Sequence, residues 1–155
     1  MKKLKNIGLL AVLIGMVLLL PACGQKNVEG TLEELMTKVY ADIPEDERPM
    51  MLTNTEVTEE NVEYFLGTTE VEYEEALASE SGVGSIAHSV VLVRVKDNAD
   101  IEGIKTKIKE SVNPRKWVCV GVEEDEVVVK NKGNLIILIM ASNGREKLET
   151  AFDNL

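Results

Sequence analysis

The hydrophobic pattern predicts two helices in the first part of the folded chain. Thr31 to Glu34 has the spacing of a capping box, in which a threonine begins a helix and a glutamate three residues later completes the cap. Apolar residues then recur at helical spacing until Pro44 ends the run. Thr58 and Gly67 have the residue types of an N-cap and a terminating glycine, so they predict a second, shorter helix. A short extended piece is expected between the helices, over residues 51–57.

Runs of apolar and β-branched residues predict the strands. Residues 90–95 form the first such run, and residues 135–140 show no polar alternation, which is typical of a central strand covered on both faces. Two further strands are expected over residues 117–122 and 127–129, and these three last strands would form a meander. The stretch 71–79 fits either an edge strand or a helix.

Two more helices follow from caps and spacing. Asp100 is expected to cap a helix with isoleucines along one face, which Asn113-Pro114 closes. A terminal helix follows Gly144, with Leu148, Phe152 and Leu155 on one face. The order of elements predicts an α+β fold. One mainly antiparallel sheet of about four or five strands would carry the two N-terminal helices, one crossover helix and a C-terminal helix.

Residues 1–22 have a different pattern. Three lysines precede an apolar run of 14 residues from Ile7 to Leu20, whereas a membrane-spanning helix needs roughly 20. Leu20-Pro21-Ala22-Cys23 resembles the lipobox of bacterial prolipoproteins, so we expect cleavage before Cys23 and acylation of its thiol. The alternatives are an ordinary secretory signal with a chance cysteine, or an uncleaved anchor. Residues 23–30 would be the lipidated cysteine and a short linker, and 31–155 a single domain.

Removal of the signal would make the protein more acidic. The whole chain carries 17 basic and 27 acidic residues, and loss of three signal lysines leaves 14 basic residues and a formal net charge of −13. Such a surface disfavours phosphate backbones, so nucleic acid is not expected as a partner. Residues 28–82 hold 16 acids against two bases. This excess would suit a cationic partner or a divalent metal, although a solvated face that maintains solubility is the preferred interpretation.

The sequence contains no recognisable catalytic or cofactor motif. His88 is the only histidine, so any scheme with a histidine-activated nucleophile must use it, with Ser85 or Ser89 closest along the chain. The alternative interpretation is a hydrogen-bonded structural histidine. Cys119 alternates with Trp117 on a predicted strand and is expected to be buried rather than reactive. One histidine and one free cysteine do not make a usual zinc site, and no cofactor is expected.

Two charged clusters remain. Arg115, Lys116 and Trp117 form a basic and aromatic cluster, which would either contact an acidic polymer such as teichoic acid or shield a sheet edge. Residues 123–126 are four consecutive acids. They lack the spacing and central glycine of a calcium-binding EF-hand loop, so a solvated turn is favoured over a calcium site.

Several of these stretches together resemble one family. They are Ile86-Ala87-His88-Ser89 with the strand that follows, the capped isoleucine helix, Pro114-Arg115-Lys116-Trp117, the apolar strand 135–140 and the closing helix. Over roughly residues 31–155 the chain resembles the uncharacterised bacterial lipoproteins grouped as domain of unknown function 4358. The resemblance implies a small exported α+β domain, typical of low-GC Gram-positive bacteria, without an assigned activity. It also implies an accessory role in modifying surface polymers, because such genes can lie beside membrane-bound O-acyltransferases.

The combined expectation is a non-enzymatic, lipid-anchored protein on the extracytoplasmic face of the cell membrane. Its partners would be the membrane, through the lipid on Cys23, and an unknown envelope protein or surface polymer. Two alternatives stay open. One is a hydrolase or acyl-transfer accessory that acts through His88, and the other is an acidic surface domain stabilised by calcium.

Overall fold

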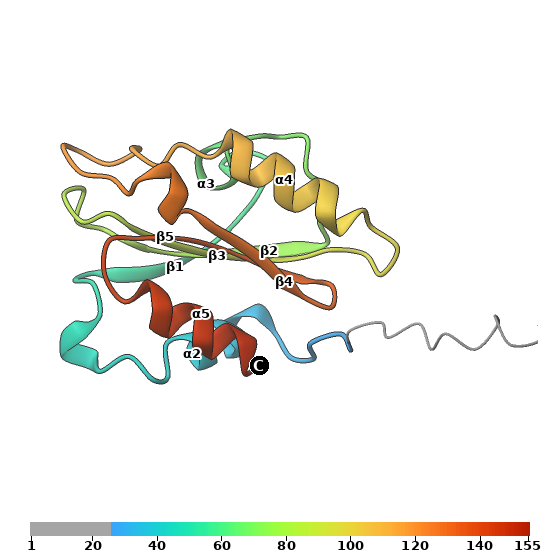
Figure 1. Ribbon diagram of the computed structural model, residues 1–155, viewed down its shortest axis with the longest axis horizontal. Helices are drawn as coiled ribbons and strands as arrows, with labels where there is room; N and C mark the ends of the chain where they lie inside the picture. The colour runs from blue at the N-terminus through green and yellow to red at the C-terminus, as the bar shows by residue number, and fades with distance from the viewer. Residues whose placement is uncertain (1–25) are drawn as a thin grey trace, which may run out of the picture.

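Five strands form one antiparallel sheet in the computed structural model, which describes residues 26–155 (Figure 1). The strands are β1 (Leu52–Glu56), β2 (Glu75–Ser81), β3 (His88–Arg94), β4 (Val128–Lys132) and β5 (Leu135–Ala141). Their order across the sheet is β1-β2-β3-β5-β4, and every neighbouring pair is antiparallel. The predicted α+β fold with an antiparallel sheet is therefore confirmed.

Four helices cover the two faces of this sheet. They are α2 (Leu32–Val39), α3 (Val62–Leu66), α4 (Ile101–Ser111) and α5 (Arg145–Asp153), with short 3₁₀ turns η1 (Glu45–Glu47) and η2 (Glu124–Glu126) between elements. Helices α3 and α4 lie on one face, and α2 and α5 lie on the other (Figure 1). The expected two N-terminal helices, crossover helix and C-terminal helix are all present among the described residues.

The helix ends follow the predicted caps with one exception. Thr31 and Glu34 form the capping box of α2, and the Asp100 side chain accepts a hydrogen bond from the Gly103 amide at the start of α4. Gly67 ends α3 in the left-handed conformation, with φ of 75°. The prediction of Thr58 as the N-cap of α3 is wrong. The helix begins after Asn61, because residues 58–61 first form a hydrogen-bonded turn of their own.

Two hydrophobic layers explain the absence of polar alternation in β5. Leu135, Ile137 and Ile139 pack toward α2 and α5, whereas Ile136, Leu138 and Met140 pack toward α3 and α4. Every residue of β5 is buried, because the strand lies between β3 and β4 and has helices over both faces. The predicted central strand at residues 135–140 is thus confirmed.

The strand predicted over residues 117–122 is wrong. This segment is a loop that crosses the end of the β2–β3 hairpin, where the Val118 amide donates to the Gly84 carbonyl and the Val122 amide to the Pro114 carbonyl. Cys119 has φ of 61°, which is incompatible with an extended strand, and its side chain is exposed rather than buried. The expected meander is therefore only the β4–β5 hairpin. The ambiguous stretch 71–79 becomes a strand from Glu75 onward.

The two ends of the sheet are distinct. At the end that we call the entry end, Asn27 bonds to Asp97 and to the Asn134 amide, and Val28 is buried beside α2. At the opposite end, which we call the hairpin end, residues 82–87 connect β2 to β3. The seven residues of β3 separate these ends by roughly 23 Å.

The predicted signal peptide and Cys23 lie outside the described residues. Within residues 26–155, no helix combines the length and the hydropathy that crossing a membrane requires.

Candidate functional site

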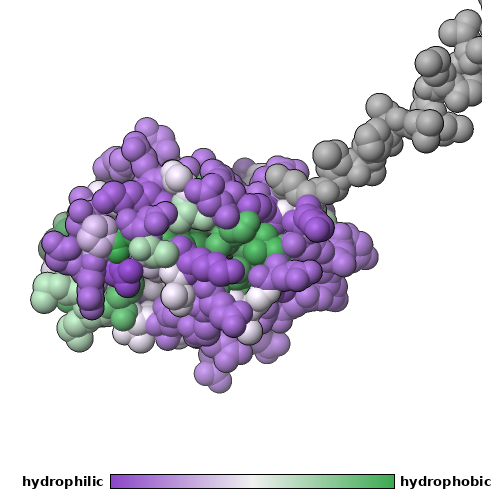
Figure 2. All heavy atoms as spheres, turned by 90° about the horizontal axis from the view of Figure 1, so that it is seen from below, coloured by the Kyte–Doolittle hydropathy of each residue, from purple (hydrophilic) through white to green (hydrophobic). Residues whose placement is uncertain are grey.

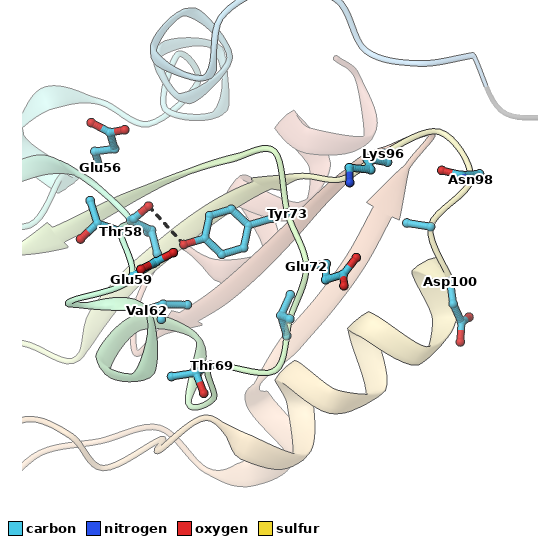
Figure 3. Close-up of a pocket in the computed structure, with 13 residues that line it drawn as sticks. Glu56, Thr58, Glu59, Val62, Thr69, Glu72, Tyr73, Lys96, Asn98 and Asp100 are labelled. Carbon is cyan, nitrogen blue, oxygen red and sulfur yellow. Dashed lines mark hydrogen bonds between the residues drawn. The ribbon is translucent and has the colours of Figure 1, made fainter.

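An open groove with a volume of about 1010 Å³ lies at the entry end, on the face of α3 and α4 (Figure 3). Three separate segments form its walls. They are residues 56–62 between β1 and α3, residues 69–73 before β2, and residues 96–100 between β3 and α4. The groove exists because these connections all leave the same end of the antiparallel strands.

Negative charge dominates the groove. Glu56, Glu59, Glu72 and Asp100 line it, and Lys96 is the only basic residue among its lining residues. Glu56, Glu59 and Glu72 are solvent-exposed. Asp100 already caps α4, so its carboxylate also compensates the positive helix end. The four carboxylates outnumber the single lysine, so the groove has a net negative charge.

Tyr73 crosses the middle of the groove. Its ring lies between the 56–59 segment and the loop that holds Lys96 and Asn98, and its hydroxyl donates to the Val57 carbonyl at 3.4 Å (Figure 3). Burial raises the pKa of Tyr73 above its ordinary value, and the charges of Glu59 and Glu56 raise it further. The phenol is therefore neutral at physiological pH and presents a partly exposed aromatic surface among carboxylates.

This arrangement suits an organic cation better than a metal ion. Within residues 26–155, no group of three or more His, Cys, Asp or Glu side chains is placed to hold a metal ion. The carboxylates are instead spread along the groove, so each would meet a different positive charge of an extended ligand. A single exposed ion pair contributes about 0.2–1 kcal/mol, and an ammonium over an exposed ring about 0.5–1 kcal/mol. Appreciable affinity thus requires several contacts at once.

The structure separates the members of the predicted basic and aromatic cluster. Lys116 Nζ lies 3.0 Å from Glu80 Oε2, and Trp117 Nε1 donates to Glu80 Oε1 at 3.0 Å. The side chains of Lys116 and Glu80 are only 5% and 13% exposed. Arg115 differs, since it is exposed and pairs with Glu123 at 2.8 Å. Of the three residues, only Arg115 presents its charge to solvent.

Aromatic rings surround the buried ammonium group. Lys116 Nζ lies 4.1 Å from the centroid of the Tyr64 ring, 5.1 Å from that of Phe65 and 5.4 Å from that of Trp117. Desolvation lowers the pKa of Lys116, and the charge of Glu80 opposes that effect. Ser89 Oγ lies 3.3 Å from Nζ, but Ser89 is fully buried. The cluster thus joins α3, the 114–122 loop and the sheet.

His88 lies on the other face of the sheet, near the hairpin end. It is 3% exposed, and its Nε2 is 2.7 Å from the Tyr40 hydroxyl. Burial lowers the pKa of His88 to about 4, so the ring is neutral at pH 7. Among residues 26–155 no carboxylate and no serine hydroxyl is hydrogen-bonded to it. Ser89 points to the opposite face, where it contacts Lys116.

Sequence reasoning did not single out the residues of the groove. Glu59, Glu72 and Tyr73 belong to three stretches without a shared motif, and only the fold brings them together. The one available signal was the excess of acids between residues 28 and 82. Glu80 was also missed, because it directly follows the stretch 71–79, which fitted either an edge strand or a helix, and a carboxylate there resembles an ordinary solvated charge.

Comparison with known proteins finds no similarity to report: no family model, no curated protein and no solved structure matches this chain. The functional proposal therefore rests on the sequence and geometry of this chain.

Proposed function

We propose that this protein is a lipid-anchored, extracytoplasmic binding module that holds a cationic segment of another envelope component. The observation that carries the proposal is the acidic groove at the entry end, with Tyr73 across it. The ligand class follows from charge, since four acids and one base line the groove. A basic peptide segment or an amine-bearing surface polymer has the required chemistry.

The position of the groove supports this proposal. The groove residues Lys96 and Asn98 are the sequence neighbours of Asp97, and Asp100 follows three residues later. The Asp97 carboxylate accepts a hydrogen bond from Asn27. Asn27 is only four residues from Cys23, and four residues span at most about 14 Å. With a lipid on Cys23, the groove would therefore lie close to the outer membrane surface. Cationic segments of membrane proteins and amine-bearing polymers rooted in the membrane are within reach there.

The lipid anchor is tested by metabolic labelling of cells with an alkyne analogue of palmitate. We expect the full chain to incorporate the label and to remain with the membrane fraction. Cys23→Ser should abolish incorporation of the label, because it removes the acceptor thiol. Labelling that persists in Cys23→Ser would overturn this part of the proposal.

The groove is tested with hexalysine as the probe, by titration calorimetry on the full chain in detergent micelles. Glu59→Gln combined with Glu72→Gln removes two charges from the groove and should weaken binding about tenfold, or 1.4 kcal/mol. The affinity should also decline as salt rises, because exposed charge pairs are screened.

A matched control separates the groove from general electrostatic attraction. Glu124→Gln combined with Asp125→Asn removes the same charge from η2, where both side chains are exposed and lie outside the groove. This control should bind hexalysine as the wild type does. Equal weakening in both double variants would mean that the net charge, and not the groove, attracts the probe.

A further inference from the structure

Exposed apolar side chains gather at the hairpin end, on a surface that we call the tip. It consists of residues 48–51, 82–87 and 117–120, whose loops meet at the left of Figure 1. The Gly82 amide bonds to the Met51 carbonyl, and the Val118 amide bonds to the Gly84 carbonyl. The large exposed hydrophobic residues of the described chain are Met50, Met51, Tyr64 and Val118, and three of these four belong to the tip.

The tip is unusual in its backbone as well. Met51 and Cys119 are the non-glycine residues of the described chain with positive φ, at 54° and 61°. Neither residue type favours this conformation, and such backbone strain is concentrated at functional positions. The side chains of Met50, Met51 and Val118 are about two-thirds or more exposed, at 70%, 69% and 67%. Figure 2 shows hydrophobic residues at this same end of the α2 and α5 face, although polar residues cover most of it.

A small pocket opens beside the methionines. Its volume is about 240 Å³, and Ile43, Pro49, Met50, Ile86 and Ala87 form its apolar lining. Pockets for drug-sized molecules and cofactors have volumes of about 300–1,000 Å³. The pocket is therefore better matched to one large side chain than to a whole small-molecule ligand.

The polar groups of this pocket favour an uncharged occupant. Glu47 pairs with Lys147 at 2.5 Å, and Arg48 donates to the carbonyls of Ile43 and Tyr40. His88 also lines the pocket, and within residues 26–155 its Nδ1 has no hydrogen-bond partner, while Nε2 contacts Tyr40. A neutral imidazole nitrogen next to an apolar cavity would bind a peptide amide or carbonyl that accompanies an apolar side chain.

The location of the tip disfavours a lipid surface as its occupant. Asn27 enters the domain at the opposite end of β3, roughly 23 Å away. A domain held to a membrane through its N-terminus would point the tip away from that membrane. A protein segment has no such restriction.

We propose that the tip is a docking surface for an apolar segment of a partner protein, with one large side chain inserted into the pocket over His88. The methionines would adapt to the flanking residues of that segment, because their side chains are flexible and polarisable. Buried anchors of this kind contribute most of the energy of small interfaces. The tip does not share residues with the acidic groove, so the two sites are tested independently.

The test uses blocked amino acids as probes and His88, the sole histidine, as the reporter. The full chain is labelled at histidine with ¹³C and ¹⁵N and observed by NMR in detergent micelles. N-acetyl-leucinamide and N-acetyl-phenylalaninamide should shift the imidazole signals in a saturable manner, whereas N-acetyl-serinamide should not. Met50→Ser should weaken the apolar probes about fivefold, and it should fold normally because Met50 is largely exposed.

Leu155→Ser is the matched control. Leu155 is a partly exposed apolar residue, and its carbonyl bonds to Lys132 near the entry end, so its loss should leave probe binding unchanged. Three results would overturn the proposal. They are equal shifts with the serine probe, shifts that follow the protein concentration and so indicate a second copy, and shifts that follow the detergent concentration and so indicate an acyl chain.

Discussion

Lys116 and Glu80 illustrate how single residues determine the stability of one face. Taking both charges out of water is costly, and the cost is offset by a complete set of partners. Glu80 accepts from Tyr64, Trp117 and Lys116, and the Lys116 ammonium has rings around it. Loss of either charge alone would leave the other buried without compensation.

Lys116→Met should therefore lower the free energy of unfolding by about 3 kcal/mol, because breaking a buried pair from one side typically costs 3–5 kcal/mol. Addition of Glu80→Gln to the same chain should restore at least half of that loss, since no isolated charge remains. Urea denaturation of the wild type, both single variants and the double variant measures the coupling. If the double variant lost as much unfolding free energy as the two single variants together, this account would be contradicted.

His88 should make stability depend on pH in a defined window. Its pKa is near 6.5 in the unfolded chain and about 4 in the folded one, because burial disfavours the charged ring. Between these values the unfolded chain binds more protons, so stability decreases as the pH falls from 6.5 to 4. The accumulated loss from this residue is about 3 kcal/mol. NMR titration of the sole histidine together with urea denaturation at several pH values checks this, and a midpoint near 6.5 would contradict it.

Residue types predicted only part of these environments. The acylation of Cys23 could be argued from residue identity alone, and it stays a prediction because Cys23 lies outside the described residues. The burial of Lys116 could not be predicted in this way. A lysine next to an arginine gives no sign that a distant carboxylate and three rings surround it. Cys119 was expected to be buried only because a strand was expected over residues 117–122. The wrong burial of Cys119 therefore followed from the wrong secondary structure of that segment.

At the scale of elements, caps and hydrophobic runs were the most reliable signals. Thr31 and Asp100 cap α2 and α4 as predicted, and β3 and β5 follow the apolar runs at residues 90–95 and 135–140. These features depend on neighbours in sequence. The segment 117–122 is also a run of apolar residues, but its Val118 and Val122 amides bond to the carbonyls of Gly84 and Pro114 and not to a neighbouring strand. The segment buries Trp117 and Lys116 beneath it, and this contact competes with an extended conformation along the sheet edge. A sequence pattern does not reveal such a tertiary contact.

Gly67 joins two helices through a contact that leaves no room for a side chain. A Cβ atom there would lie 2.2 Å from the Ser111 backbone, at the end of α4, and φ is +75°. Gly67→Ala should therefore lower the free energy of unfolding by at least about 2 kcal/mol, from left-handed strain together with the clash. Thermal denaturation measures the effect.

Gly84→Ala provides the comparison for Gly67→Ala. A Cβ atom at Gly84 would meet only Val118 Cγ2, at an ordinary 3.6 Å. This variant should lie within about 0.5 kcal/mol of the wild type. Similar losses of unfolding free energy at both positions would mean that the close contact between α3 and α4 is not the reason that position 67 requires glycine.

At the scale of the whole molecule, the sheet separates two surfaces of opposite character. The acidic groove lies at the entry end and the apolar tip lies at the hairpin end. The acid excess between residues 28 and 82 could be counted in the sequence, whereas its concentration in a groove depends on which strand ends coincide. The tip was not predictable, because its three loops are far apart in the chain.

The exposure of Cys119 permits a direct test of the proposed location. In intact cells, a membrane-impermeant sulfonated maleimide should label Cys119, because its thiol is exposed in the folded domain. Cys23 should not react, since its thiol carries the proposed lipid. Mass spectrometry should find one label per wild-type chain and none in Cys119→Ser. Because Cys119 belongs to the proposed docking surface, the labelling is repeated with Met50→Ser, which weakens docking at the tip. Labelling that appears only after cell lysis in this variant as well would contradict an extracytoplasmic domain.

The hydrogen bonds of Asn27 to Asp97 and Asn134 have a consequence for affinity. Because the chain is fixed to the domain at this residue, only residues 24–26 lie between Asn27 and Cys23, and the reach from Asn27 to Cys23 is at most about 14 Å. A lipid at Cys23 would hold the groove within a thin layer over the membrane. Partners in the same layer would meet it at an effective concentration in the millimolar range, as short linkers provide. Ion pairs too weak to retain a soluble ligand would then be sufficient to keep the groove occupied.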